Sequence, residues 1–200
     1  MLITVDGLDG SGKTSSIKKL VEWCNDNGIK ATSVVEPGTT PLGLHIRQFH
    51  LEHSNTITPM TQVHLMLAAR CENAQHIKKL LEEYDVVIVD RWLHSTLVYQ
   101  YISHLDYWKD EDTFDWIVDE HHKVVGDLVP DRMFYLAVPH DLRRSRLEAR
   151  GELYELDKAT FTEDRDAMGR ECAEMLAMTI FEHDVTFVED TKRYLKHNAR

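Results

Sequence analysis

The chain reads Gly7-Leu8-Asp9-Gly10-Ser11-Gly12-Lys13-Thr14 at residues 7–14, and these residues match the pattern G-x-x-x-x-G-K-[ST] at every fixed position. A short apolar run leads into them and an amphipathic run follows, which predicts a strand, a glycine loop and a helix. Glycines let the backbone N–H groups converge on phosphate oxygens, and the helix points its positive end at the same place. Lys13 adds a full charge at the β- and γ-phosphates, and the Thr14 hydroxyl suits Mg²⁺. The pattern therefore predicts a cradle for a nucleoside triphosphate.

Strand and helix patterns alternate along the rest of the chain. The strand candidates are Leu2–Asp6, Ala31–Val35, Val86–Asp90, Met133–Val138 and Val185–Val188. The helix candidates are Lys13–Asn27, Leu42–His53, Pro59–Glu83, Ser95–His104, Phe114–Val125, Leu142–Arg150 and Phe161–His183. This alternation predicts an α/β protein with a parallel sheet and helices on both faces. No repeat or linker divides the chain, so we expect a single domain over residues 1–200.

Charge and composition restrict the class of partner. The formal net charge is −11 and the pI is about 5.5, so the chain repels polyanions and a nucleic-acid partner is not expected. A small anionic substrate needs only a local cluster of positive side chains. No apolar run approaches the length of a membrane span, and three well-separated cysteines fit reduced thiols, so we expect a cytoplasmic protein without a membrane partner. The pair His121–His122 indicates a solvated helix face rather than a metal site.

Five segments, in the right order and over nearly the whole chain, resemble bacterial-type thymidylate kinases. They are Asp6–Thr14; Glu36-Pro37-Gly38-Thr39-Thr40-Pro41-Leu42-Gly43 with Ile46-Arg47; Leu65-Met66-Leu67-Ala68-Ala69-Arg70; Asp90-Arg91 with Ser95-Thr96 and Tyr99-Gln100; and, more weakly, Arg150-Gly151-Glu152-Leu153. The resemblance implies the P-loop nucleoside monophosphate kinase fold, with a five-stranded parallel sheet flanked by helices and a small mobile lid. It also implies ATP as phosphoryl donor, Mg²⁺ as cofactor, dTMP or a related deoxynucleoside monophosphate as acceptor, and a homodimer. The apolar run Met60–Ala69 is compatible with that dimer, and core packing explains it equally well.

Asp90 and Arg91 end an apolar strand, which is where ligands bind in open α/β sheets. In the family that the chain resembles, the matching arginine holds the acceptor phosphate and reaches toward the γ-phosphoryl group. This makes Arg91 a catalytic candidate beside Lys13, and it places Asp90 with Thr14 at the metal, directly or through water. A buried structural ion pair is the alternative interpretation of Asp90 and Arg91.

The resemblance assigns the acceptor site to several segments. Arg47 and Arg70 match arginines that face the monophosphate and the base, although either one alone would indicate a surface arginine. Met66 lies on the same helix face as Arg70 and stands where the family usually has a stacking phenylalanine; plain core packing is the alternative. The other acceptor candidates are Asp9 and Glu36 near the 3′-hydroxyl and the metal waters, Thr96 and Gln100 at the base edge, Tyr99 beneath the deoxyribose, and Ser95 within the same motif.

Arg143, Arg146 and Arg150 are spaced by three and four residues, so they form one stripe on a helix. We expect a lid over about residues 143–157 that closes these arginines over the transferring phosphoryl group, with Arg150 as a catalytic candidate. A solvated helix with ordinary ion pairs is the alternative. The candidate ATP-binding residues are Gly7, Asp9, Gly10, Ser11, Gly12, Lys13, Thr14, Arg143, Arg146 and, by its match to the family's adenine-contacting loop, Thr191.

The expected function is phosphoryl transfer from ATP to dTMP. A phosphate monoester has a second pKa of about 6, so the acceptor is already mostly dianionic at pH 7 and needs no general base. A deoxynucleoside kinase is one rival, in which Glu36 would act as the base. A nucleotide-binding protein without transfer activity is another. The chain departs from the family pattern at Val35, Thr39, Met66, Trp92 and, in the lid, Glu155. Thr39, Met66 and Trp92 fall near the acceptor, and they favour a third possibility, an altered base specificity.

Overall fold

The computed structural model describes residues 1–110, 112–151 and 167–173. Its strands are β1 Leu2–Asp6, β2 Ala31–Val35, β3 Val86–Asp90 and β4 Arg132–Tyr135. Its helices are α1 Lys13–Asp26, α2 Pro41–His53, α3 Pro59–Glu83, α4 Leu93–Thr96, a π-helical turn Leu97–Tyr101, a 3-10 turn Ile102–His104, α5 Thr113–Val125 and α6 His140–Arg150, and residues 167–173 are also helical. The predicted α/β class is confirmed.

The described strands form one parallel sheet in the order β2-β3-β1-β4. The expected five-stranded sheet is therefore corrected to four strands among the described residues; the fifth candidate, Val185–Val188, lies outside them, as does most of Phe161–His183. The last strand ends at Tyr135 rather than at Val138. The reason is that β1 stops at Asp6, where the glycine loop turns away and leaves β4 without a partner.

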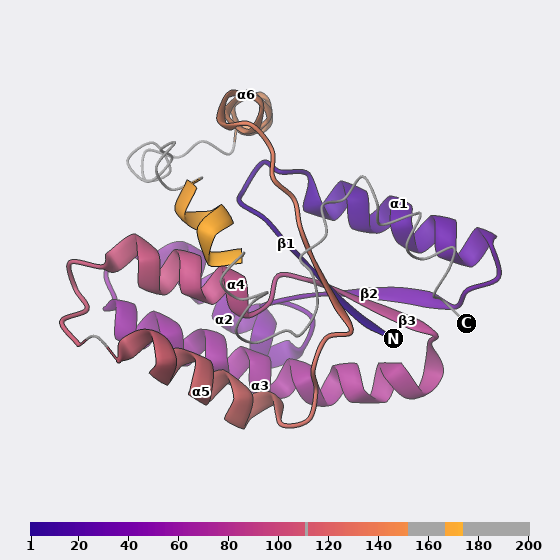
Figure 1. Cartoon of the computed structure of the whole chain (residues 1–200), viewed down its shortest axis with the longest axis horizontal. Coiled ribbons are helices and arrows are strands. Elements are labelled where there is room, and N and C mark those ends of the chain that lie inside the picture. Colours follow the sequence, from indigo (N-terminus) through magenta and orange to yellow (C-terminus); the bar gives the residue numbers. More distant parts are fainter. Residues whose placement is uncertain (111, 152–166, 174–200) are drawn as a thin grey trace.

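Alternating side chains of the sheet build two separate cores. In β3, Val87 and Val89 pack in a cluster with residues of α3 and α5, whereas Val86 and Ile88 pack in a cluster with residues of α1. Figure 1 shows the same division, with α1 on one side of the sheet and α3 and α5 on the other. Because both faces are covered, every residue of β1 and β3 is buried, which explains why their sequences are mostly apolar.

Local sequence signals set the helix boundaries. Thr40 and Thr58 cap α2 and α3 by accepting a backbone N–H with the side-chain oxygen, and a proline follows each of them at the first helical position. Gly28 has a φ of 78°, which a helix stop at Asn27-Gly28 requires. One predicted helix is corrected: Ser95–His104 is divided among α4, the π-helical turn and the 3-10 turn. In the described part of the chain, no helix combines the length and apolar character of a membrane span.

The sheet brings two loops together at one edge. The central strands β1 and β3 are paired in parallel, with Val5 opposite Asp90. Their carboxyl ends therefore lie side by side, and the chain leaves them as the glycine loop and as Arg91. Ligands of open α/β sheets bind at such an edge.

Candidate active site

The loop after β1 is a tight turn that surrounds the Lys13 ammonium group. Gly7, Gly10 and Gly12 have positive φ values of 144°, 78° and 91°. A Cβ atom on Gly10 would lie 2.7 Å from the carbonyl oxygen of Arg143, so a side chain there would collide with the backbone of α6. Lys13 is 5% exposed, and its Nζ donates a 2.6 Å hydrogen bond to the carbonyl oxygen of Gly7. The ammonium group of Lys13 therefore lies inside the loop.

Thr14 and Asp90 form a pair of oxygen ligands beside the loop. Thr14 Oγ1 donates a 3.1 Å hydrogen bond to Asp90 Oδ2. The other oxygen, Oδ1, is buried and has no hydrogen-bond partner among the described residues. A hydroxyl and a carboxylate are the donors that Mg²⁺ takes in phosphoryl-transfer sites, often together with water. The two residues predicted to hold the metal are therefore adjacent and chemically suited to it.

Arg91 is oriented by three polar or aromatic neighbours. Its φ is 75°, a left-handed conformation that non-glycine residues rarely adopt. The guanidinium forms an ion pair with Asp9, donates to Ser95 Oγ at 3.1 Å and lies over the Tyr99 ring at 5.2 Å. Tyr99 in turn donates its hydroxyl hydrogen to Asp9 Oδ2 at 2.9 Å. Four predicted site residues thus meet at the carboxyl ends of β1 and β3.

The charged groups of this cluster shift one another's pKa values. Burial acts to raise the pKa of Asp9, but Arg91 and Lys13 outweigh it and the pKa falls to about 2. The Asp9 side chain is 52% exposed, so the neighbouring cations rather than burial decide its ionisation. Burial acts to lower the pKa of Arg91, and Asp9 outweighs it and raises the pKa above its ordinary value. Burial, assisted by the charge of Arg91, lowers the pKa of Lys13 to about 8.

A buried network beneath Arg91 fixes Ser95. The Ser95 hydroxyl donates a 2.7 Å hydrogen bond to Asp6 Oδ1, at the end of β1. Burial acts to raise the pKa of Asp6, but the contact with His94 and the bond from Ser95 outweigh it and lower the pKa. His94 Nε2 donates a 2.8 Å hydrogen bond to the carbonyl oxygen of Gly169. The support of Arg91 therefore extends to the described C-terminal helix.

A second cluster surrounds Arg70 on α3, which is 2% exposed. Its Nε atom forms an ion pair with Glu36, and its Nη2 atom donates to Thr96 Oγ1 at 2.8 Å. Asn73 Nδ2 donates to the second oxygen of Glu36 at 3.4 Å. Burial raises the pKa of Glu36, since it outweighs the opposing effect of Arg70. Met66 lies on α3 one turn before Arg70, is 7% exposed and packs against α2.

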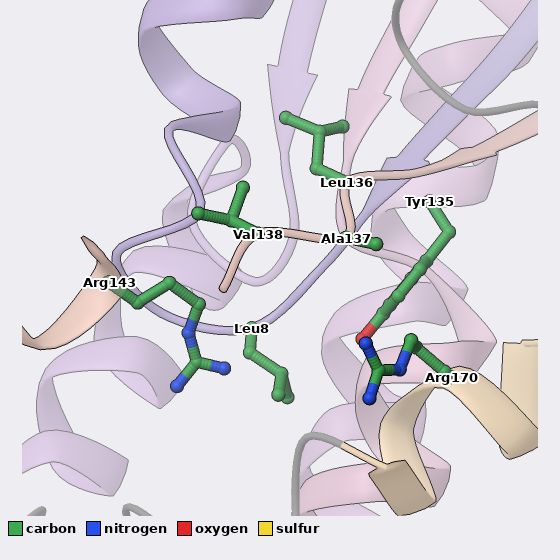
Figure 2. A pocket seen from close by; sticks show the side chains of 7 residues that line it. All are labelled: Leu8, Tyr135, Leu136, Ala137, Val138, Arg143 and Arg170. Carbon is green, nitrogen blue, oxygen red and sulfur yellow. The ribbon is translucent and has the colours of Figure 1, made fainter. Parts of the chain in front are cut away.

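The helix α6 lies over the glycine loop (Figure 1). Arg146 Nη1 donates to the carbonyl oxygens of Gly10 and Ser11, each at 3.1 Å. Arg143 is 3% exposed and lines a small pocket beside the loop. Figure 2 shows Arg170, from the described C-terminal helix, reaching toward the same pocket from the opposite side. Two arginines of the predicted stripe therefore add positive charge next to the loop.

This combination of loop, metal-suited pair and arginines agrees with comparisons against known proteins. A family model described as thymidylate kinase matches residues 5–195. The chain belongs to the thymidylate kinase family. It is 37% identical to the thymidylate kinase of Chlorobaculum tepidum over 68% of this chain and 61% of that protein, which is less than two thirds of the relative's length. It is 35% identical to that of a Marinomonas species, over 80% of this chain and 73% of that protein. The crystal structure of thymidylate kinase from Ehrlichia chaffeensis superposes with a TM-score of 0.59 at 27% identity, covering 80% of this chain and 85% of that chain.

Several residues expected to act in a thymidylate kinase site lie outside these clusters. Arg47 is on the exposed side of α2 and donates to the carbonyl oxygen of Pro37 at 3.0 Å. Arg150, the last residue of α6, is exposed. Gln100 is buried within the π-helical turn. Thr191, Glu155 and residues 152–157 of the expected lid lie outside the described residues.

The sequence-based prediction for His121 is wrong. A solvated helix face is predicted for the histidine pair, yet His121 is 2% exposed and only His122 faces solvent. The signal that identifies the buried one is helical spacing. Ile117, His121 and Val125 are four residues apart, and all three are buried on the inner face of α5.

Other contributors to the site were missed for different reasons. Asp6 stands at the carboxyl end of an apolar strand, and a charge in that place is itself a signal of function. His94 and Arg170 offer no comparable signal, because His94 bonds to the distant Gly169 and Arg170 lines a pocket whose other residues are far away in the chain.

The pKa of Lys13 leads to a prediction about pH. Phosphate binds more tightly when the Lys13 ammonium group is protonated, and free Lys13 loses its proton near pH 8. The complex thus holds a proton that the free protein has released, so affinity falls as the pH rises. Titration calorimetry with a non-hydrolysable ATP analogue should show binding up to about fivefold weaker at pH 9 than at pH 8. The same titrations with Lys13→Ala should lack this dependence; parallel pH profiles for the two proteins would contradict the assignment.

Proposed function

We propose that this chain transfers the γ-phosphoryl group of ATP to the phosphate of dTMP, giving ADP and dTDP. The observation that carries the proposal is the pairing of Lys13 in the glycine loop with Arg91 at the end of the neighbouring strand. One group is suited to the donor phosphates and the other to an acceptor phosphate. Membership of the thymidylate kinase family supports the identity of the acceptor.

The task of the protein's own residues is to hold two polyanions together. Two unit charges ~4 Å apart repel by about 4 kcal/mol at an effective dielectric constant of 20. Lys13 binds the β- and γ-phosphates, Arg91 orients the acceptor phosphate, and Thr14 and Asp90 would hold Mg²⁺. Bound magnesium would supply further neutralisation of the phosphate charge. In the same proposal, Arg143, Arg146 and Arg150 lie on the donor side, and closure of the lid excludes water.

The contacts of Glu36 favour a phosphate acceptor over a sugar hydroxyl. A deoxynucleoside kinase would need this carboxylate as a general base. Both oxygens of Glu36 are already hydrogen-bonded, one to Arg70 and one to Asn73, and the side chain is 2% exposed. A phosphate acceptor is already dianionic and needs no base.

A panel of acceptors tests the proposal. ATP-dependent formation of diphosphates is measured with dTMP, dUMP, dCMP, dGMP and thymidine. The proposed function requires turnover of dTMP and little or none of thymidine. Preferred use of thymidine would establish the rival kinase, and ATP binding without turnover of any acceptor would establish a non-catalytic protein. Preference for a monophosphate other than dTMP would assign a changed base pocket, with Met66 as the first residue to exchange for phenylalanine.

A homodimer is proposed as the working form, with α2 at the interface. Most of Met60–Ala69 is accounted for by the core, since Met66 and Ala69 are buried. The exposed apolar side chains lie instead on α2, where Leu44 is 53% and Leu51 is 73% exposed beside a hollow that residues of α2 line. Sedimentation velocity should show a dimer for the parent protein and a monomer for a Leu44→Glu/Leu51→Glu variant. A monomeric profile for both the parent and the variant would contradict the proposed homodimer.

The proposed partners are otherwise small nucleotides, in the cytoplasm. The net charge of −11 disfavours nucleic acid as a ligand. The three cysteines are free thiols, with Cys71 exposed, which suits a reducing compartment.

A further inference from the structure

The buried face of α5 places a histidine against the arginine of the acceptor site. His121 Nδ1 lies 3.4 Å from Arg70 Nη1. A guanidinium only donates hydrogen bonds, so the histidine nitrogen must accept and the ring proton must be on Nε2. The ring also meets Trp92 edge-on at 5.4 Å, and Arg70 lies over the same indole at 5.5 Å. Arg70, Trp92 and His121 therefore form one packed unit from three segments.

The charge state of His121 agrees with this geometry. Burial, followed by the neighbouring charges of Arg70 and His122, lowers the pKa of His121 well below 6.5. The ring is therefore neutral at pH 7, and its Nδ1 lone pair remains available to Arg70. The proposed function gives Arg70 a role, contact with the base, but it gives no role to His121.

The hydrogen-bond partners of the Arg70 guanidinium show what His121 contributes. A guanidinium has five N–H groups. Glu36 accepts the one on Nε, while Thr96 Oγ1 at 2.8 Å and the carbonyl oxygen of Trp92 at 3.3 Å accept those on Nη2. His121 accepts one of the two on Nη1. Within the described residues, this leaves a single Nη1 hydrogen to offer to a ligand.

We propose that His121 is a positioning residue of the acceptor site, which holds Arg70 so that its one remaining N–H donates to a carbonyl oxygen on the nucleotide base. The inference rests on the proposed function and deepens it. The N–H donor of Arg70 forms a hydrogen bond with a keto oxygen but not with an amino group, which is itself a donor. The arrangement therefore favours a 4-keto pyrimidine over a 4-amino one. Without His121, a second Nη1 hydrogen of Arg70 has no acceptor among the described residues and the guanidinium loses one of the bonds that orient it, so this selection weakens.

Two substitutions separate the acceptor role from packing. His121→Phe keeps an aromatic ring beside Trp92 and removes the acceptor. His121→Asn is smaller and packs less well, but its side-chain oxygen stands close to the position of Nδ1 and is able to accept from Arg70. His122→Phe and His122→Asn, at the exposed neighbour on the same helix, are the matched controls.

We expect His121→Phe to raise the KM for dTMP about tenfold, to leave the KM for ATP unchanged and to reduce the preference for dTMP over dCMP. His121→Asn should stay within about threefold of the parent for dTMP, and both His122 variants should match the parent. Equal losses in the two His121 variants, or an equal rise in the KM for ATP, would assign a packing role and overturn the proposal. Thermal melting shows whether each variant folds. If His121→Phe does not fold, the KM of His121→Asn for dTMP tests the proposal.

An independent readout does not require turnover. Long-range ¹⁵N–¹H NMR spectra of the parent protein should show His121 as the Nε2–H tautomer, and the signals should change in an Arg70→Met variant. A proton on Nδ1 would overturn the proposal even if dTMP is the substrate. If no acceptor is phosphorylated but the tautomer is as expected, the proposed function fails while the contact with Arg70 stands.

Discussion

Replacing Lys13 with alanine is expected to lower kcat for dTMP phosphorylation by about 10³-fold, or about 4 kcal/mol of transition-state stabilisation. The Nζ atom lies inside the glycine loop, where a charged donor strengthens its hydrogen bonds as negative charge spreads over the transferring group. Most of the loss should appear in kcat, because the remaining loop N–H groups still bind the donor. Coupled measurement of ADP release at saturating ATP and dTMP gives the value.

Lys18→Ala is the matched control for Lys13, because Lys18 is exposed on the same helix. It should keep kcat within about twofold of the parent. Far-UV circular dichroism and thermal melting establish that both variants are folded. If Lys13→Ala retains more than about a tenth of the parent kcat, the loop is not the phosphate cradle proposed above.

Replacing Arg91 is expected to have a comparable effect, about 10³-fold or more on kcat/KM for dTMP. The guanidinium is the group proposed to bridge the two substrates, and Asp9 and Ser95 hold it in one orientation. Its backbone φ of 75° makes the choice of substitution informative. Alanine keeps the strained conformation, whereas glycine adopts it freely, so Arg91→Gly should be more stable than Arg91→Ala by about 1 kcal/mol and equally inactive.

The pair of Arg91 variants separates catalysis from folding. Thermal melting should rank glycine above alanine, while steady-state kinetics should not distinguish them. Arg144→Ala is the control, because Arg144 is exposed and makes a surface ion pair with Glu148 at 3.0 Å. Its kinetics should match the parent. Activity that follows stability across the two Arg91 variants would assign this residue to the fold rather than to transfer.

Contiguous motifs made the glycine loop and its flanking strand and helix predictable. The glycine loop, the strand before it and the helix after it are adjacent in sequence, so their interactions need little from the rest of the chain. The bounds of β1, β2 and β3 are as predicted, because apolar runs of this length with buried neighbours form strands. The position of Asp90 and Arg91 at the sheet edge follows from the same pattern.

For the proposed acceptor side, the sequence named residues but not their contacts. The resemblance named Glu36, Arg70 and Thr96, but their contacts join positions 26 and 34 residues apart in the chain. No local pattern reports such a contact. The end of β4 and the divided helix after β3 also depend on neighbouring segments, and both differ from the prediction.

The sequence by itself determined the class of fold and the place of the glycine loop between a strand and a helix, because that information lies in short-range patterns of glycine, charge and apolar residues. The tertiary structure alone decided how each charge is held. It turned His121 inward against Arg70, set Asp6 beneath Ser95 and brought Arg146 onto the loop. The physical reason is that burial and hydrogen bonding between distant segments arise only once the sheet and its two helical layers have packed.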